Sequence, residues 1–194
     1  MLIFISFAHY IHIMLTVEKT AIEGPLILKP KIFYDERGYF YEPYNRLRFV
    51  EAGVNQEFVQ DNQSLSQKGA VRGLHFQAPP FDQGKLVRVV SGAVLDVVVD
   101  IRKDSPTYGK HIAIELSAEN FIQFWVPPGF AHGFATLRDD TIFQYKCTNY
   151  YNKSSEGGIR WNDPELAIKW GIADAIISEK DAALPMFNQF ISPF

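Results

Sequence analysis

The sequence is poor in cysteine, in excess charge of either sign and in long apolar runs. Cys147 is the only cysteine among 194 residues, so no disulfide can form within the chain, and a reducing, cytoplasmic location is expected. A formal charge of −3 argues against a nucleic-acid groove, which needs a basic face. No repeat, low-complexity block or linker divides the chain, which is long enough to bury one complete core.

The first fifteen residues, MLIFISFAHYIHIML, are the longest apolar stretch. They lack the positive start and the small-residue cleavage site of a signal peptide, and they are too short to cross a membrane comfortably. We expect residues 1–13 to be an apolar N-terminal extension and residues 14–194 to form a single domain. An added edge strand or dimer contact, or a membrane anchor, are the alternatives.

Aromatic residues are abundant, with 16 Phe and 9 Tyr, and they favour strands. Short runs rich in Val, Ile, Phe and Tyr alternate with Gly, Pro, Asn and Asp, which is typical of an all-β sandwich or barrel. The fold class predicted is a mostly antiparallel, double-sheet jelly roll with short peripheral helices. Strands are expected at 38–44, 58–64, 71–77, 85–90, 93–101, 112–116, 121–126, 133–135 and 141–149, and helices at 45–52 and near 178–183.

One pair of runs suggests a specific turn. The segments 85–90 and 93–101 flank Ser91-Gly92. Two strand-like runs around a two-residue turn are typical of a β-hairpin, so these strands are expected to pair with each other.

The run Arg72-Gly73-Leu74-His75-Phe76-Gln77 contains the first candidate for proton transfer. His75 is the side-chain type best suited to take a proton near neutral pH. In a regular strand His75 and Gln77 share a face and Arg72 points the other way, but Gly73 could host a bulge that turns Arg72 round. The alternative is a histidine with only a structural hydrogen bond.

A second histidine follows a Pro-Gly turn in Pro127-Pro128-Gly129-Phe130-Ala131-His132. The pattern Pro-x-Gly-x-x-His resembles the second motif of the cupin superfamily, whose histidine often binds metal. The first cupin motif would supply His-x-His, where this chain has His75-Phe76-Gln77. Because catalytic metal sites usually have three protein ligands, we expect no metal here.

Three further residues can have either a catalytic or a purely structural role. Lys85 begins an apolar strand, where it could simply be solvated. Asp96 is flanked by apolar residues and should have a partner if it is buried. Tyr145 can be a weak acid, a stacking surface or plain core.

Taken together, these motifs resemble one family, the dTDP-4-dehydrorhamnose 3,5-epimerases, in order and spacing from about Val17 to Phe187. Arg-Gly-Leu-His followed by Gln-Gly-Lys-Leu-Val-Arg-Val is the most specific pair. The other matching runs are 35–42, 58–62, 127–134, 145–146 with Tyr151, 158–163 and 178–181. The resemblance implies a cupin barrel, that is, a double-stranded β-helix.

The resemblance also implies residue roles. His75 is similar to the family's general base, Asp181 to its paired carboxylate, Lys85 to the lysine that stabilises the enolate oxygen, and Tyr145 to the acid on the opposite ring face. Asp96 corresponds to a supporting position behind the pocket. The expected substrate contacts are Arg37, Phe40, Glu42, Gln60, Asn62, Arg72, His132 and Tyr151.

The activity implied is epimerisation at C3 and C5 of dTDP-4-dehydro-6-deoxy-D-glucose in dTDP-L-rhamnose biosynthesis for cell-surface polysaccharide. No cofactor, nucleic acid or membrane is expected, and a homodimer with exchanged strands is implied. Alternatives are an enzyme that epimerises a single carbon of a related sugar, a metal-dependent cupin enzyme, and a sugar-binding jelly roll without catalysis.

Overall fold

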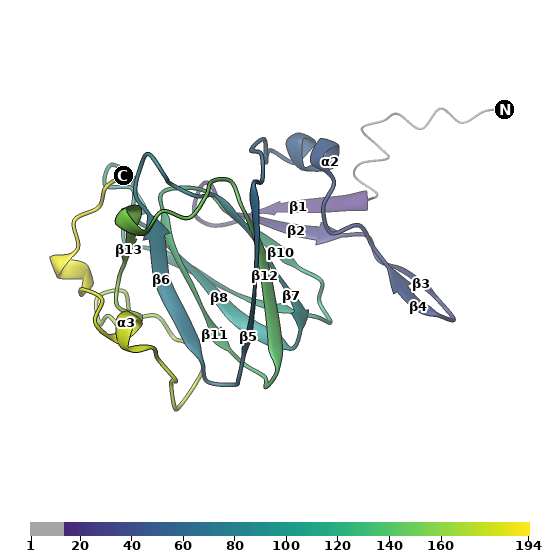
Figure 1. Cartoon of the computed structure of the whole chain (residues 1–194). Helices are drawn as coiled ribbons and strands as arrows, with labels where there is room; N and C mark the ends of the chain where they lie inside the picture. Colours follow the sequence, from purple (N-terminus) through teal and green to yellow (C-terminus); the bar gives the residue numbers. More distant parts are fainter. Residues whose placement is uncertain (1–13) are drawn as a thin grey trace.

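The computed structural model describes residues 14–194, in which two antiparallel sheets face each other (Figure 1). The expectation for residues 1–13 lies outside the described residues. The larger sheet has the spatial order β1 (Leu15–Lys19), β2 (Leu26–Pro30), β10 (Gln123–Val126), β7 (Lys85–Ser91), β12 (Thr141–Cys147) and β5 (Gln60–Ser66). The smaller sheet has the order β13 (Glu156–Gly158), β6 (Val71–Gln77), β11 (Phe130–Thr136), β8 (Ala93–Asp100) and β9 (His111–Ser117). The predicted all-β double-sheet architecture is confirmed.

The core between the sheets follows from alternation along the strands. Val87 and Val89 of β7 belong to one buried cluster with Val94 and Val98 of β8. The intervening residues of β8 point the other way, where Val97 and Val99 join a second cluster with the C-terminal part of the chain. Because β8 is covered on both faces, seven of its eight residues are buried.

The predicted hairpin between β7 and β8 is wrong. β7 pairs with β10 and β12, whereas β8 pairs with β9 and β11 in the opposite sheet. Gly92, at φ +79°, is the one residue between the two strands, while Ser91 does not have a positive φ. A type I′ turn needs positive φ at both central residues and a type II′ turn needs it at the first. The chain therefore crosses between the sheets at Gly92, and valines of both strands meet inside.

The remaining elements lie around the barrel. The two short strands β3 (Phe33–Asp35) and β4 (Gly38–Phe40) form a hairpin that projects from the body (Figure 1). The predicted strand at 38–44 ends at Phe40. Helix α2 (Arg46–Glu51) begins after Asn45, whose side chain accepts hydrogen bonds from the helix start.

The C-terminal part holds α3 (Glu179–Ala182) and two 3₁₀ helices, Lys153–Ser155 and Phe187–Gln189. The helices expected at 45–52 and near 178–183 are thus present as α2 and α3. Among the helices of residues 14–194, none is long and apolar enough to cross a membrane.

Candidate active site

A histidine–carboxylate pair lies on the wall formed by the smaller sheet. Nε2 of His75, on β6, is 2.6 Å from Oδ1 of Asp181, and Oδ2 of Asp181 accepts a hydrogen bond from the backbone N–H of Gly73 at 3.2 Å. Ser178 caps α3 through the N–H of Asp181, which fixes the buried carboxylate beside the ring. Burial raises the pKa of Asp181, but hydrogen bonds from His75 and Gly73 outweigh it and leave this pKa below its usual value.

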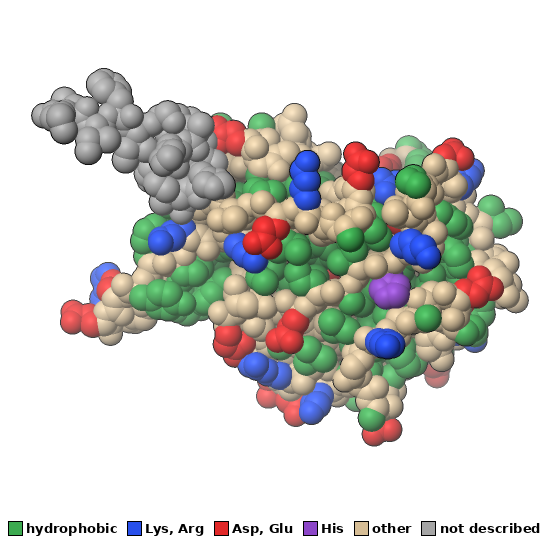
Figure 2. Space-filling view, turned by 180° about the vertical axis from the view of Figure 1, so that it is seen from behind, with side chains coloured by type: hydrophobic (Ala, Val, Ile, Leu, Met, Phe, Trp, Pro, Cys, Tyr) green, Lys and Arg blue, Asp and Glu red, His purple; other side chains and the backbone are tan. Residues whose placement is uncertain are grey.

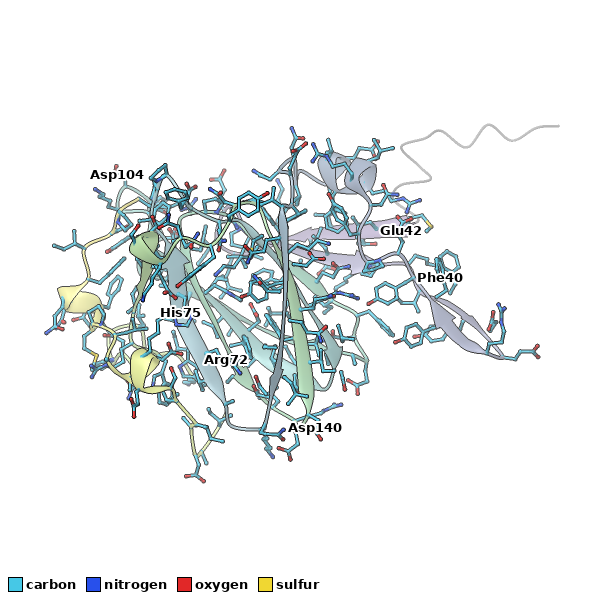
Figure 3. The ribbon with its side chains drawn as sticks, in the orientation of Figure 1. Phe40, Glu42, Arg72, His75, Asp104 and Asp140 are labelled. Carbon is cyan, nitrogen blue, oxygen red and sulfur yellow. The ribbon has the colours of Figure 1, made fainter. Side chains whose placement is uncertain are left out.

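The bulge that Gly73 could host is present. His75 lies opposite His132 and Arg72 opposite Phe134, so three steps on β6 match two on β11. Gly73 has φ +128°, and a Cβ there would lie 2.5 Å from the Cα of Gly133. The bulge allows Arg72 and His75 to line the same cavity of about 430 Å³ (Figure 3).

The opposite wall of this cavity belongs to the larger sheet. Tyr145 of β12 pairs in register with Val87 of β7 and Asn62 of β5, and Cys147 pairs with Lys85. Asn62, Lys85 and Tyr145 line the cavity together with His75. Tyr145 and His75 therefore lie on opposite sheets around one space.

Burial affects the ionisation of the groups on this wall. It lowers the pKa of Lys85, and the nearby negative charges of Asp96 and Glu156 offset this only in part. Lys85 forms no ion pair with any residue that the structure describes. Burial also raises the pKa of Tyr145, so its phenol keeps its proton at neutral pH. The cavity thus combines a buried lysine amine that has no ion-pair partner among residues 14–194 with a protonated phenol.

A second histidine–carboxylate pair lies next to the first. Nε2 of His132 is 2.9 Å from Oδ2 of Asp96, and both side chains are buried. The partner expected for a buried Asp96 is therefore His132. Because His132 lines the cavity beside His75, its ring is presented to a ligand with a fixed orientation.

The mouth of the cavity carries a network of polar side chains. The hydroxyl of Tyr151 donates to Glu156 at 2.9 Å, and Nζ of Lys180 donates to the other oxygen of Glu156 at 2.6 Å. Gln60 accepts from the backbone N–H of Tyr151 and donates to Asn62. Glu156 and Lys180 were missed in the sequence. Lys180 precedes Asp181 in a matching run, but no pattern indicated Glu156.

Three expected substrate contacts are not brought to this cavity. Arg37 and Phe40 lie on the projecting β3–β4 hairpin, and Glu42 follows it (Figure 3). Arg37 is paired with Asp35, and Glu42 with Arg48. Phe40 is 69% exposed. Figure 2 shows hydrophobic side chains gathered around the base of this hairpin, on the face seen there.

Gln77 occupies the position at which a cupin has a metal-binding histidine, but its side chain is hydrogen-bonded to backbone groups. Its amide nitrogen donates to the carbonyls of Phe81 and Tyr150, and its oxygen accepts from the N–H of Asn152. Within residues 14–194, no cluster of three or more His, Cys, Asp or Glu side chains could hold a metal ion.

The outer face of the larger sheet also has a hollow. Its side chains include Arg88, Gln144 and Lys146. Arg88 is hydrogen-bonded to Gln144 at 2.5 Å, and Lys146 is paired with Asp61 at 2.9 Å. No histidine lines this hollow. The cavity between the sheets is therefore the candidate site.

The double-sheet barrel, with two histidine–carboxylate pairs facing a lysine and a tyrosine, defines the chain as a cupin-type barrel with an internal site for a small molecule. Residues 19–189 match the family model described as dTDP-4-dehydrorhamnose 3,5-epimerase. The chain belongs to this family.

Individual relatives agree with the family match. The dTDP-4-dehydrorhamnose 3,5-epimerase of Salmonella typhimurium is 54% identical over 178 residues, covering 91% of this chain and 97% of the relative. The crystal structure of the same enzyme from Elizabethkingia anophelis has a TM-score of 0.86 at 50% identity, covering 90% of this chain and 97% of that one. The Legionella pneumophila dTDP-6-deoxy-D-glucose-3,5-epimerase, in complex with dTDP-4-keto-L-rhamnose, has a TM-score of 0.88 at 48% identity and covers 91% and 95%.

Proposed function

We propose that the protein converts dTDP-4-dehydro-6-deoxy-D-glucose to dTDP-4-dehydro-L-rhamnose by inverting C3 and C5. The observation that carries the proposal is the placement of His75 with Asp181 on one sheet and Tyr145 on the other, around one cavity. Inversion through an enolate requires that a proton leave one face of the sugar ring and another arrive on the opposite face. Two facing walls supply that geometry.

His75 is the base. Asp181 accepts the N–H of Nε2, which fixes the tautomer and leaves Nδ1 for the substrate proton. C3 and C5 both flank the C4 ketone, so both protons are acidified and one base serves the two positions. Removal of either proton forms an enolate with its negative charge on the C4 oxygen.

Lys85 stabilises this oxygen. Its ammonium has no carboxylate partner among the described residues, so its charge is available to the enolate as the enolate forms. Tyr145 then protonates the carbon from the far face, because its buried phenol still carries its proton. Asp96 holds the ring of His132, which contacts the sugar.

The nucleotide part binds at the mouth. The exposed ring of Tyr151 offers a stacking surface for the base, and the amides of Gln60 and Asn62 offer hydrogen bonds. Arg72 lines the same cavity and binds the diphosphate that joins the nucleoside to the sugar. No cofactor is needed, because the ketone of the substrate already acidifies the protons that move.

The site is completed by a second copy of the chain in a homodimer. Arg37, Phe40 and Glu42 lie on or beside a hairpin that projects away from its own cavity, and its aromatic residues are exposed. We assign these three residues to the cavity of the partner subunit, where Phe40 contacts the sugar or nucleoside.

Mixed dimers test this arrangement. An Arg37→Ala chain and a His75→Asn chain are each expected to be nearly inactive alone. Co-refolded together, they form heterodimers in which one of the two sites is intact, so activity should return to about a quarter of the wild-type value if subunits pair at random. No recovery in verified heterodimers would contradict a shared site.

The proposed location is the cytoplasm, and the proposed pathway is dTDP-L-rhamnose synthesis for cell-surface polysaccharide. The function itself is tested with dTDP-4-keto-6-deoxyglucose in heavy water, followed by NMR of the sugar. Deuterium at both C3 and C5 is expected. Deuterium at one carbon would indicate an epimerase that acts on a single carbon. Absence of deuterium at both carbons would contradict epimerisation and would favour a sugar-binding protein or a different cupin reaction.

A further inference from the structure

The side chain of Gln77 is hydrogen-bonded to two loops at the mouth of the cavity. Gln77 is the last residue of β6, two positions after His75, and is 5% exposed. Its three side-chain hydrogen bonds all go to backbone groups: Nε2 to Phe81 O at 2.6 Å and Tyr150 O at 3.1 Å, and Oε1 from Asn152 N at 2.6 Å.

Two of these bonds flank Tyr151. The carbonyl of Tyr150 precedes it and the N–H of Asn152 follows it, so the single amide of Gln77 holds the peptide groups on both sides. Tyr151 lies beyond the end of β12, in a loop without strand partners. Its ring orientation therefore depends on Gln77, on the bond from its N–H to Gln60, and on its hydroxyl bond to Glu156.

The third bond fixes the opposite side of the mouth. Phe81 lies in the loop between β6 and β7, and Gln83 of this loop lines the cavity beside Tyr151. Gln83 in turn donates to the carbonyl of Asn149 at 2.7 Å, which ties the loop to the segment that carries Tyr151. The amide of Gln77 is therefore the shared anchor of both loops.

We propose that Gln77 is a positioning residue that sets the ring of Tyr151 and the loop of Gln83 to receive the nucleoside of the substrate. This inference rests on the proposed function, because that function places the nucleotide at the mouth. The three hydrogen bonds of this buried amide all support the backbone, and a substitution that removes the amide leaves these backbone groups without their partner. The effect reaches the ligand through Tyr151, not through contact with the reacting carbons.

The test uses the full chain with Gln77→Leu and Gln77→Glu. The leucine removes all three bonds, and the glutamate keeps an acceptor for Asn152 but loses both donors. The expected result is a rise of about 10-fold in the KM of the nucleotide sugar and in the Kd of dTDP, with kcat changed by less than about 3-fold, as for a loss of uniform binding. Thr141→Val serves as the control, because the buried hydroxyl of Thr141 is also bonded to backbone groups, Arg138 O and Ala93 N, and does not line the cavity.

A double-mutant cycle separates positioning from general destabilisation. In a Tyr151→Ala background, Gln77→Leu should raise the Kd of dTDP by less than about 2-fold, because the residue through which it acts is gone. If Gln77→Leu does not fold, Gln77→Glu replaces it in the same cycle. Equal effects of the Gln77 variant in both backgrounds, or a fall in kcat with unchanged KM, would overturn the inference. A wild-type protein that neither binds dTDP nor exchanges deuterium would overturn the proposed function, and this inference with it.

Discussion

The carboxylate of Asp181 lies 2.6 Å from the imidazole of His75, although 106 positions separate the two residues in the chain. The contact is made because the segment after β13 returns α3 to a place beside β6, where Asp181 lines the same cavity as His75. The carboxylate is oriented by the capped start of α3 and by the backbone N–H of Gly73 on β6.

This pair leads to the first prediction. His75→Asn should abolish deuterium exchange at both carbons, because one base serves both. Asp181→Asn keeps the shape of the pair but no longer stabilises the required tautomer or the imidazolium, so exchange should slow by about 10²-fold or more. NMR of the sugar in heavy water measures both effects.

Asp100→Asn is the matched control for Asp181→Asn. Asp100 is also a buried carboxylate, but its partners are Arg102, Ser105 and Thr107, away from the cavity. Its variant should exchange deuterium at the wild-type rate. An exchange rate in the His75 variant equal to that of the wild type would mean that the base lies elsewhere.

The second prediction concerns Lys85. Lys85→Met removes the charge and retains most of the length, and kcat should fall by about 10²–10³-fold, the usual effect of losing a group that stabilises an oxyanion. Lys146→Met removes a lysine from the outer face of the same sheet, where it is paired with Asp61, and should have little effect. A normal kcat in the Lys85 variant would mean that another group stabilises the enolate oxygen.

The pH dependence of kcat in the wild type should also reflect the lowered pKa of Lys85. Burial lowers this pKa from 10.5, so the protonated form that stabilises the enolate is lost at a lower pH than for an exposed lysine. The alkaline limb of kcat should therefore fall below pH 10.5, and Lys85→Arg should remove that limb if the variant retains activity. The measurement is kcat as a function of pH for both proteins.

Asp100 provides a prediction about stability. Burial opposes its ionisation, but Arg102, Ser105 and Thr107 outweigh burial and lower its pKa from 3.8 to about 2. A carboxyl group whose folded-state pKa is depressed stabilises the fold above its unfolded pKa and loses this contribution as pH falls through the folded value. The contribution of about 2 kcal/mol near neutral pH should fade between about pH 4 and pH 2.

Denaturant unfolding of the wild type and of Asp100→Asn at several pH values tests this point. The difference in the free energy of unfolding should be largest above pH 4 and should narrow steadily toward pH 2. A difference that stays constant over this range would show that the ion pair does not depress the pKa of Asp100 in solution.

A further prediction concerns metal. The amide of Gln77 is bonded to three backbone groups, and within residues 14–194 no group of three His, Cys, Asp or Glu side chains could hold a metal ion. Chelator-treated protein should keep its turnover, and elemental analysis should find no stoichiometric transition metal. Activity that disappears with chelator and returns with added iron or zinc would contradict the proposed mechanism.

The sequence predicts a strand well where alternation is strong, as in β12, where Thr141, Phe143 and Cys147 are buried on one face. It does not predict which strands pair. The two valine-rich runs around Ser91-Gly92 predict a β7–β8 hairpin, but the chain crosses at Gly92 to the opposite sheet, where β8 is buried on both faces. The strands β1, β2, β3 and β13 were missed. β3 and β13 have only three residues each, too few for periodicity to show.

For the site, the residue types and the Gly73 bulge could be predicted because they depend on local sequence. The distance between His75 and Asp181, the pairing of His132 with Asp96, and the role of Glu156 depend on which strands and loops meet in three dimensions. No spacing in the chain encodes these contacts. The position of the β3–β4 hairpin away from its own cavity is a similar case: the family resemblance implied exchanged strands, but no local pattern identified this hairpin as the projecting segment.

The central claim, that acid and base act from opposite sheets, is tested most directly by Tyr145→Phe. This change keeps the ring and its packing but removes the phenolic proton. The variant should still bind substrate and take up deuterium through His75, while inversion falls by about 10²-fold or more relative to exchange. NMR in heavy water follows exchange and inversion in one sample. A ratio of inversion to exchange far below that of the wild type is the predicted result; a fall of both by the same factor would show that Tyr145 only binds substrate and would contradict the two-face mechanism.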